Sequence, residues 1–113
     1  REVLQRVQEF EAEIGESAYF KYHQGLLLDE MGRPRRAVRM YARALELDDT
    51  DPEIWKAKGN AHFNLEELDL AIECYDEALE RDIDNEEVWN NRGFTFFTAG
   101  FMTVAIDCYR QAV

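Results

Sequence analysis

Residues 52–85 read PEIWKAKGNAHFNLEELDLAIECYDEALERDIDN, and residues 86–113 start the same pattern again as EEVWNNRGFTFFTAGFMTVAIDCYRQAV. The two stretches align with an offset of 34 residues, and the same offset reaches back to residues 18–51. An internal period of about 20 to 50 residues indicates a stacked repeat architecture. The recurring positions are Gly25, Gly59 and Gly93; Ala37, Ala71 and Ala105; Tyr41, Tyr75 and Tyr109; and Ala44, Ala78 and Ala112.

Within each repeat, these residues are spaced as they would be on two facing helices. Gly59 falls on the first helix and Ala71 on the second, where small residues let two helix backbones approach closely. Tyr75 lies one turn after Ala71 and fills the space that the small residues leave. Because one helix pair cannot bury its apolar face alone, the stacking of successive pairs has to supply the core. We therefore expect an all-α chain of seven helices without strands.

Two of the units resemble the tetratricopeptide repeat (TPR) family most closely. The residues that carry the resemblance are Trp55, Gly59, Phe63, Ala71, Tyr75 and Ala78 in one unit and Trp89, Gly93, Phe96, Ala105, Tyr109 and Ala112 in the next. The first unit departs from the pattern at Lys21, where the tryptophan belongs. The resemblance implies a right-handed superhelical solenoid of antiparallel helix pairs and a non-catalytic scaffold for protein–protein interaction.

The repeat register predicts a single TPR domain fragment, taken from a longer array. Val3, Val7 and Phe10 lie 34 residues before positions of the second helix of the first unit, and they indicate a degenerate preceding repeat. Apolar side chains left uncovered on the terminal helices would allow a homo-oligomer to form there. The expected parts are the second helix of the preceding repeat at 1–14, two full repeats at 18–51 and 52–85, and a truncated repeat at 86–113. Ser17, Asp51 and Asn85 are predicted to cap the first helices of the three later units.

The charge of the chain limits which partners it can bind. With 13 basic and 24 acidic residues, the net charge is −11, which repels nucleic acid and anionic membranes and favours a basic protein or peptide. No apolar run approaches the length of a membrane span. Cys74 and Cys108 hold equivalent places in successive repeats, too far apart for a disulfide. They are predicted to be buried thiols of a cytoplasmic protein.

Five arginines interrupt the acidic pattern. They are Arg33, Arg35, Arg36, Arg39 and Arg43, and three of them repeat at a spacing of four on one helix. One interpretation makes them a solvated face whose charges pair with the neighbouring helix at Glu73, Asp76 and Glu77. The other interpretation makes them a docking patch for an acidic partner.

The sequence supports neither catalysis nor a cofactor or metal site. It has no glycine-rich phosphate loop, no paired histidines at metal-ligand spacing and no nucleophile–base arrangement. His62 is predicted to be a packed, hydrogen-bonded residue rather than a ligand. The acidic strings at 48–51 and 82–85 lack the glycine and closing glutamate of a calcium loop, and helix capping accounts for them.

The resemblance implies that the first helices line a concave groove that receives an extended peptide. Asparagine suits such a surface because its amide can both donate to and accept from a peptide backbone. The expected partner-binding residues are Tyr22, His23, Lys56, Asn60, Phe63, Asn64, Asn90, Asn91, Phe94 and Phe97, with Leu26, Ala57 and Thr98 on the same stripe. Because Asn60 and Asn91 are expected to be exposed, replacing both with alanine should leave helicity and stability nearly unchanged.

Three functional interpretations remain open at this stage. The first is a general peptide groove, and the second is a structural spacer or self-association module whose asparagines are simply soluble helix-surface residues. The third is a clamp for a peptide's C-terminal carboxylate, as in the chaperone-binding subgroup of this family. Lys56, Asn60 and Asn91 match three positions of that clamp, which is incomplete in this chain.

Overall fold

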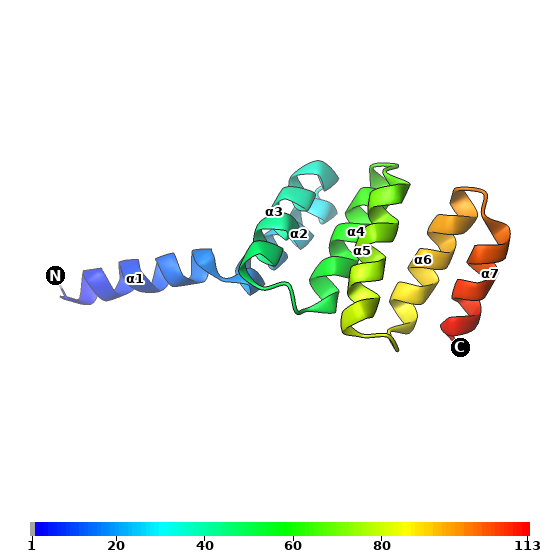
Figure 1. Ribbon diagram of the computed structural model, residues 1–113. Helices are drawn as coiled ribbons and strands as arrows, with labels where there is room; N and C mark the ends of the chain where they lie inside the picture. Colours follow the sequence, from blue (N-terminus) through cyan, green and yellow to red (C-terminus); the bar gives the residue numbers. More distant parts are fainter. Residues whose placement is uncertain (1) are drawn as a thin grey trace.

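The computed structural model describes the backbone of residues 2–113 and the side chains of residues 2–9 and 17–113. Within these residues the chain forms helices only, as predicted. The seven helices are α1 (Glu2–Glu16), α2 (Ala18–Glu30), α3 (Pro34–Leu47), α4 (Pro52–Asn64), α5 (Leu68–Arg81), α6 (Glu86–Thr98) and α7 (Met102–Gln111). The molecule is elongated, 64 × 27 × 18 Å, and its two termini lie at opposite ends (Figure 1).

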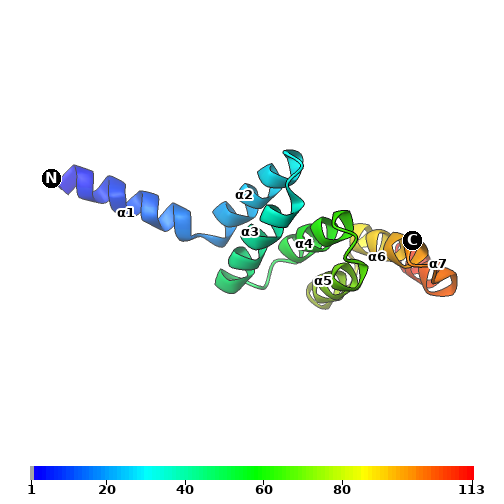
Figure 2. The ribbon, with the colours of Figure 1, turned by 90° about the horizontal axis from the view of Figure 1, so that it is seen from above.

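Six of the helices form three hairpins that stack side by side. α2 packs on α3, α4 on α5, and α6 on α7, while α3 also contacts α4 and α5 contacts α6. Seen from above, α3 and α5 lie on one side of the stack and α2, α4 and α6 on the other (Figure 2). The first helices thus form one layer and the second helices another, as the resemblance to the TPR family implied.

Helix α1 stands out from the stack and contacts mainly α2 (Figure 1). Val3 and Val7 are exposed on it, and the side chain of Phe10 lies outside the described residues. A helix at this position agrees with the expected range 1–14, but its assignment to a preceding repeat stays a prediction.

The recurring glycines and tyrosines meet inside each hairpin. A Cβ atom added to Gly59 would lie 2.6 Å from Cε1 of Tyr75, and one added to Gly25 would overlap the same atom of Tyr41. Tyr41 and Tyr75 are almost fully buried. The glycine is therefore needed in each unit because a tyrosine ring fills the space where its side chain would be.

The predicted caps begin the first helices. The side chains of Ser17, Asp51 and Asn85 accept hydrogen bonds from backbone amides in the first turns of α2, α4 and α6. The turns inside the hairpins need a left-handed residue, which is Gly32 in the first repeat and Gly100 in the third. The equivalent residue of the second repeat is Glu66, with a φ of 63°.

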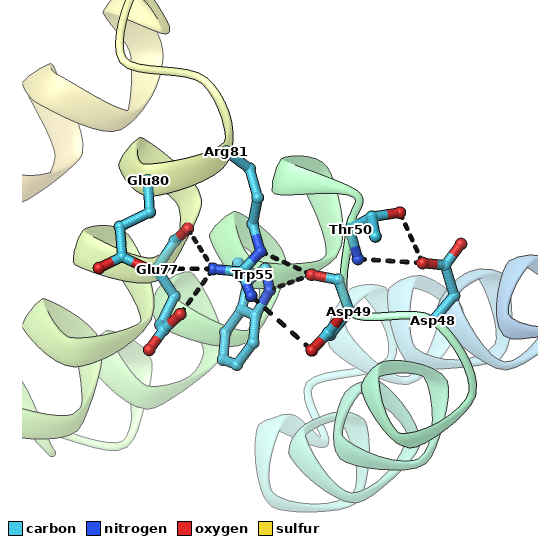
Figure 3. A network of polar contacts seen from close by, with 7 residues as sticks. All are labelled: Asp48, Asp49, Thr50, Trp55, Glu77, Glu80 and Arg81. Carbon is cyan, nitrogen blue, oxygen red and sulfur yellow. Dashed lines mark hydrogen bonds and ion pairs between the residues drawn. The ribbon is translucent and has the colours of Figure 1, made fainter.

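The same contact recurs at two repeat boundaries through the tryptophans. Trp55 donates through its indole nitrogen to the carbonyl of Asp49, at 2.9 Å, and Trp89 donates in the same way to Ile83, at 2.7 Å. Arg81 adds a second hydrogen bond to the Asp49 carbonyl, at 2.6 Å, and its guanidinium lies 4.9 Å from the Trp55 ring centroid (Figure 3). The loop before α4 is thereby tied to the end of α5.

One expectation for the charged residues is wrong. Asp76 pairs with Arg92 at 2.7 Å, and Glu77 pairs with Arg81 at 2.6 Å. The arginines of α3 are exposed, and among the described residues they make no ion pair with these carboxylates. The arginine side chains point away from the stack, because the opposite side of α3 is buried through Ala37, Tyr41 and Ala44.

The buried polar and sulfur-containing residues behave as expected. Cys74 and Cys108 are free and buried, and His62 is buried with its Nδ1 atom 3.1 Å from a carboxylate oxygen of Glu67. In the described part of the chain, no group of side chains could hold a metal ion. None of the described helices is both long and apolar enough to cross a membrane.

Candidate partner-binding groove

A hollow of about 310 Å³ opens between α4 and α6 on the layer of first helices. Five of the predicted partner-binding residues meet there, together with two residues that the sequence analysis did not select. Its lining consists of Asn60, Phe63, Asn64, Tyr75, Glu87, Asn91 and Phe94.

Asn60 is at the centre of the polar contacts in this hollow. Its Oδ1 atom accepts a hydrogen bond from the Tyr75 hydroxyl, at 2.5 Å, and another from the side-chain amide of Asn91, at 3.1 Å. Burial raises the pKa of Tyr75, so its hydroxyl stays protonated and remains a donor. This arrangement leaves the Asn60 amide nitrogen as a donor and the Asn91 oxygen as an acceptor for a ligand.

Both asparagines therefore differ from the sequence-based expectation, because they are half-buried rather than exposed. Removing the Asn60 side chain would leave the buried Tyr75 hydroxyl without its acceptor. The expectation that alanine at positions 60 and 91 leaves the stability unchanged does not hold for this geometry.

Lys56 is held between two carboxylates at one end of the hollow. Its Nζ atom lies 2.5 Å from Glu53 and 2.9 Å from Glu87, and 13% of its side chain is exposed. Partial burial alone would lower the pKa of Lys56, but hydrogen bonds and charge from the two glutamates outweigh it and raise that pKa. The lysine is thus already neutralised, and the group of three side chains carries a net negative charge.

Aromatic rings supply the apolar part of the hollow. The ring centroids of Phe63 and Phe94 are 5.5 Å apart, and Phe94 is 53% exposed. Phe63 and Asn64 also line a second hollow of about 490 Å³ with Glu66, Leu68 and Thr98. The two hollows share these two residues, and we call them together the groove.

The other predicted residues do not line the first hollow. Tyr22 and His23 belong to the first repeat, where Tyr22 packs near Tyr41 with ring centroids 6.1 Å apart and His23 lies 4.2 Å from the Tyr19 ring. Asn90 and Phe97 are exposed on α6. Lys56 contacts the lining of the hollow through its ion pair with Glu87. Leu26 packs against the core cluster around Ala37 and Tyr41. The expectation that Ala57 lies on the groove surface is wrong, because this residue is buried.

Glu87 and Tyr75 line the hollow and were missed in the sequence analysis. Glu87 lies 34 residues after Glu53, so both carboxylates occupy the first turn of a first helix. Glu53 and Glu87 occupy the same position in successive repeats, and Lys56 follows Glu53 by three residues. This spacing is the sequence signal that could have identified the cluster of Lys56 with the two glutamates. Tyr75 was assigned to the core alone, although its hydroxyl reaches the groove.

Stacked antiparallel hairpins, each closed by a glycine against a tyrosine, define a helical-repeat solenoid. The sequence matches the tetratricopeptide repeat family over residues 22–86 and again over residues 56–113, so the chain belongs to this family. A comparison with curated protein sequences finds no significant match.

Solved structures share the fold at low sequence identity. MamA superposes with a TM-score of 0.85 at 19% identity, covering 93% of this chain and 61% of MamA. The second TPR of Spaghetti (RPAP3), bound to the HSP90 peptide SRMEEVD, gives 0.82 at 16% identity and covers 92% and 95%. The Yersinia enterocolitica chaperone SycD, in complex with a peptide of the translocator YopD, gives 0.79 at 18% identity and covers 81% and 70%. The chain thus spans about three fifths of the length of MamA.

Proposed function

We propose that this chain is a non-catalytic scaffold that binds an extended peptide or partner segment in the groove between α4 and α6. The observation that carries the proposal is the hollow at Asn60, Asn91 and Phe94, where a donor, an acceptor and an exposed aromatic ring lie together. Such a combination suits a peptide backbone with an apolar side chain. Two structures with the same fold hold peptides, which supports this mode of binding.

The charges of the groove favour a basic partner. Glu87 is the charged residue that lines the first hollow, and 64% of its side chain is exposed. Lys56 is shared between Glu53 and Glu87, so it offers little attraction to a further carboxylate. A peptide with a lysine or arginine near Glu87 would gain an ion pair, whereas the C-terminal carboxylate of a clamp ligand would be repelled.

A structural spacer is the alternative from another class. It draws support from the internal hydrogen bonds of Asn60, which show that this residue also contributes to the packing of α4 against α5 and α6. In a spacer, the groove would stay empty and changes on its exposed surface would have no effect on function.

A selection of displayed random peptides can separate the two functions. We would measure the affinity of a selected peptide by fluorescence anisotropy for the native chain and for the variant Asn64→Ala/Phe94→Ala. Both positions are exposed, so the variant should remain folded. We expect the affinity to fall by about tenfold or more, and the selected peptides to be enriched in lysine and arginine.

The matched control is Leu70→Ala/Glu80→Ala, which changes two exposed residues of α5 outside the groove. It should bind the peptide as the native chain does. If both variants lose affinity equally, or if no peptide is selected at all, the result would contradict peptide binding in the groove and favour the spacer function.

A further inference from the structure

The exposed side of α3 carries a stripe of positive charge that the chain itself does not neutralise. Arg35, Arg39 and Arg43 recur every four residues, about 6 Å apart along the helix axis, and all three are exposed. With four arginines and one glutamate, α3 has a net charge of +3. Other cations of the chain (Lys56, Arg81 and Arg92) lie in ion pairs, so the α3 arginines differ from them.

The equivalent side of α5 carries the opposite charge at the same repeat positions. A shift of 34 residues takes Arg35, Arg39 and Arg43 to Asp69, Glu73 and Glu77, respectively. Asp69 and Glu73 are exposed, and Glu77 is partly exposed beside Arg81. With five acidic residues and one arginine, α5 has a net charge of −4.

Helices α3 and α5 lie on the side of the stack opposite to α2, α4 and α6 (Figure 2). The buried residues of α3 are Ala37, Tyr41 and Ala44, and their equivalents are buried in α5, so the charged stripes point outward in both helices. The two helices are equivalent units of one solenoid, and they therefore run in the same direction.

We propose that this face docks a second copy of the chain, with α3 of each copy against α5 of the other. A two-fold axis parallel to the helices brings α3 opposite the partner's α5 and simultaneously brings α5 opposite the partner's α3. In this dimer Arg39 faces Glu73 of the second copy, and Arg35 and Arg43 face Asp69 and Glu77, the residues one repeat further along the chain. Each pairing forms twice.

The overall charge of −11 on each copy opposes this contact at long range. At physiological ionic strength, that repulsion is screened beyond about 8 Å, whereas paired side chains in contact are affected less. An isolated exposed ion pair contributes little, so the dimer depends on the whole network of symmetric pairs and should be of modest affinity. A charge reversal would act on two contacts at once because of the symmetry.

Sedimentation equilibrium of charge-reversal variants tests the proposal. We expect the native chain to dimerise within a concentration range of about 5–500 µM, and Arg39→Glu or Glu73→Arg to weaken the dimer by about tenfold or more. An equimolar mixture of the two single variants should recover dimers, because every 39–73 contact in the mixed dimer joins opposite charges. The double variant Arg39→Glu/Glu73→Arg should likewise dimerise as the native chain does.

Arg110→Glu is the matched control for Arg39→Glu, since it makes the same change of net charge on an exposed residue of α7. It should leave the dimer unchanged. Helical circular dichroism of all variants checks that they are folded, which the exposure of both positions leads us to expect. A monomer at every concentration, a dimer indifferent to both reversals, or a mixture that fails to recover dimers would overturn the proposal.

Discussion

At the scale of single residues, the contact between Gly59 and Tyr75 leaves no room for a side chain at position 59. We predict that Gly59→Ala lowers the free energy of unfolding by about 1–3 kcal/mol, because the new Cβ would overlap a buried tyrosine ring. Urea denaturation measures the change. Asn64→Ala, an exposed position on the same helix, is the control and should remain within about 0.5 kcal/mol of the native chain.

Asp29 is a residue whose charge opposes folding. Burial raises its pKa, although the hydrogen bond from the Tyr41 hydroxyl acts in the other direction, and its Oδ1 atom is buried without a partner among the described residues. A raised carboxyl pKa in the folded state means that the folded chain holds the proton more tightly than the unfolded chain. The contribution of Asp29 to stability is therefore greatest below its unfolded pKa and is lost as the pH rises through the folded value.

We predict that Asp29→Asn gains stability relative to the native chain as the pH rises above about 4, since asparagine cannot ionise and still accepts from Tyr41. Denaturant midpoints at a series of pH values give the difference between the two proteins. A difference that stays constant with pH, or one that grows toward acid, would show that the Asp29 carboxyl ionises without penalty.

At the scale of elements, the turn between α4 and α5 departs from its two equivalents. Gly32 and Gly100 adopt a positive φ in the first and third repeats, whereas the second repeat has Glu66 there. We predict that Glu66→Gly raises the free energy of unfolding by about 0.5–1 kcal/mol, because glycine adopts the left-handed region without the steric penalty of a Cβ atom. Thermal unfolding followed by circular dichroism tests this, with Glu67→Gly as the comparison, which should destabilise the chain.

At the scale of the whole molecule, each hairpin is stabilised by its neighbours. The protection of backbone amides against hydrogen exchange should therefore vary along the solenoid. α4 and α5 are covered on both sides, whereas α1 contacts mainly α2. We predict that the amides of residues 2–9 exchange with solvent at least about a hundredfold faster than those of α4 and α5. Hydrogen exchange followed by mass spectrometry measures this gradient. Uniform protection along the chain would mean that it unfolds as one cooperative unit.

The sequence by itself determined the architecture of this protein. The period of 34 residues, the glycine–tyrosine spacing and the capping residues predicted the helices and their pairing, since these features act over one or two turns or recur in every unit. The resemblance to the TPR family, carried over by the repeat spacing, assigned Asn60, Asn64 and Phe94 to one side of the first helices.

Only the tertiary structure decided what these side chains contact. Lys56 meets Glu87 across 31 residues, Asn60 accepts from Tyr75, and the α3 arginines remain without the partners expected for them. A repeat pattern specifies which residues share a helix face but not the distances between side chains of different helices. Those distances depend on how the hairpins pack and turn relative to one another, and they determine whether a charge is neutralised internally or left for a partner.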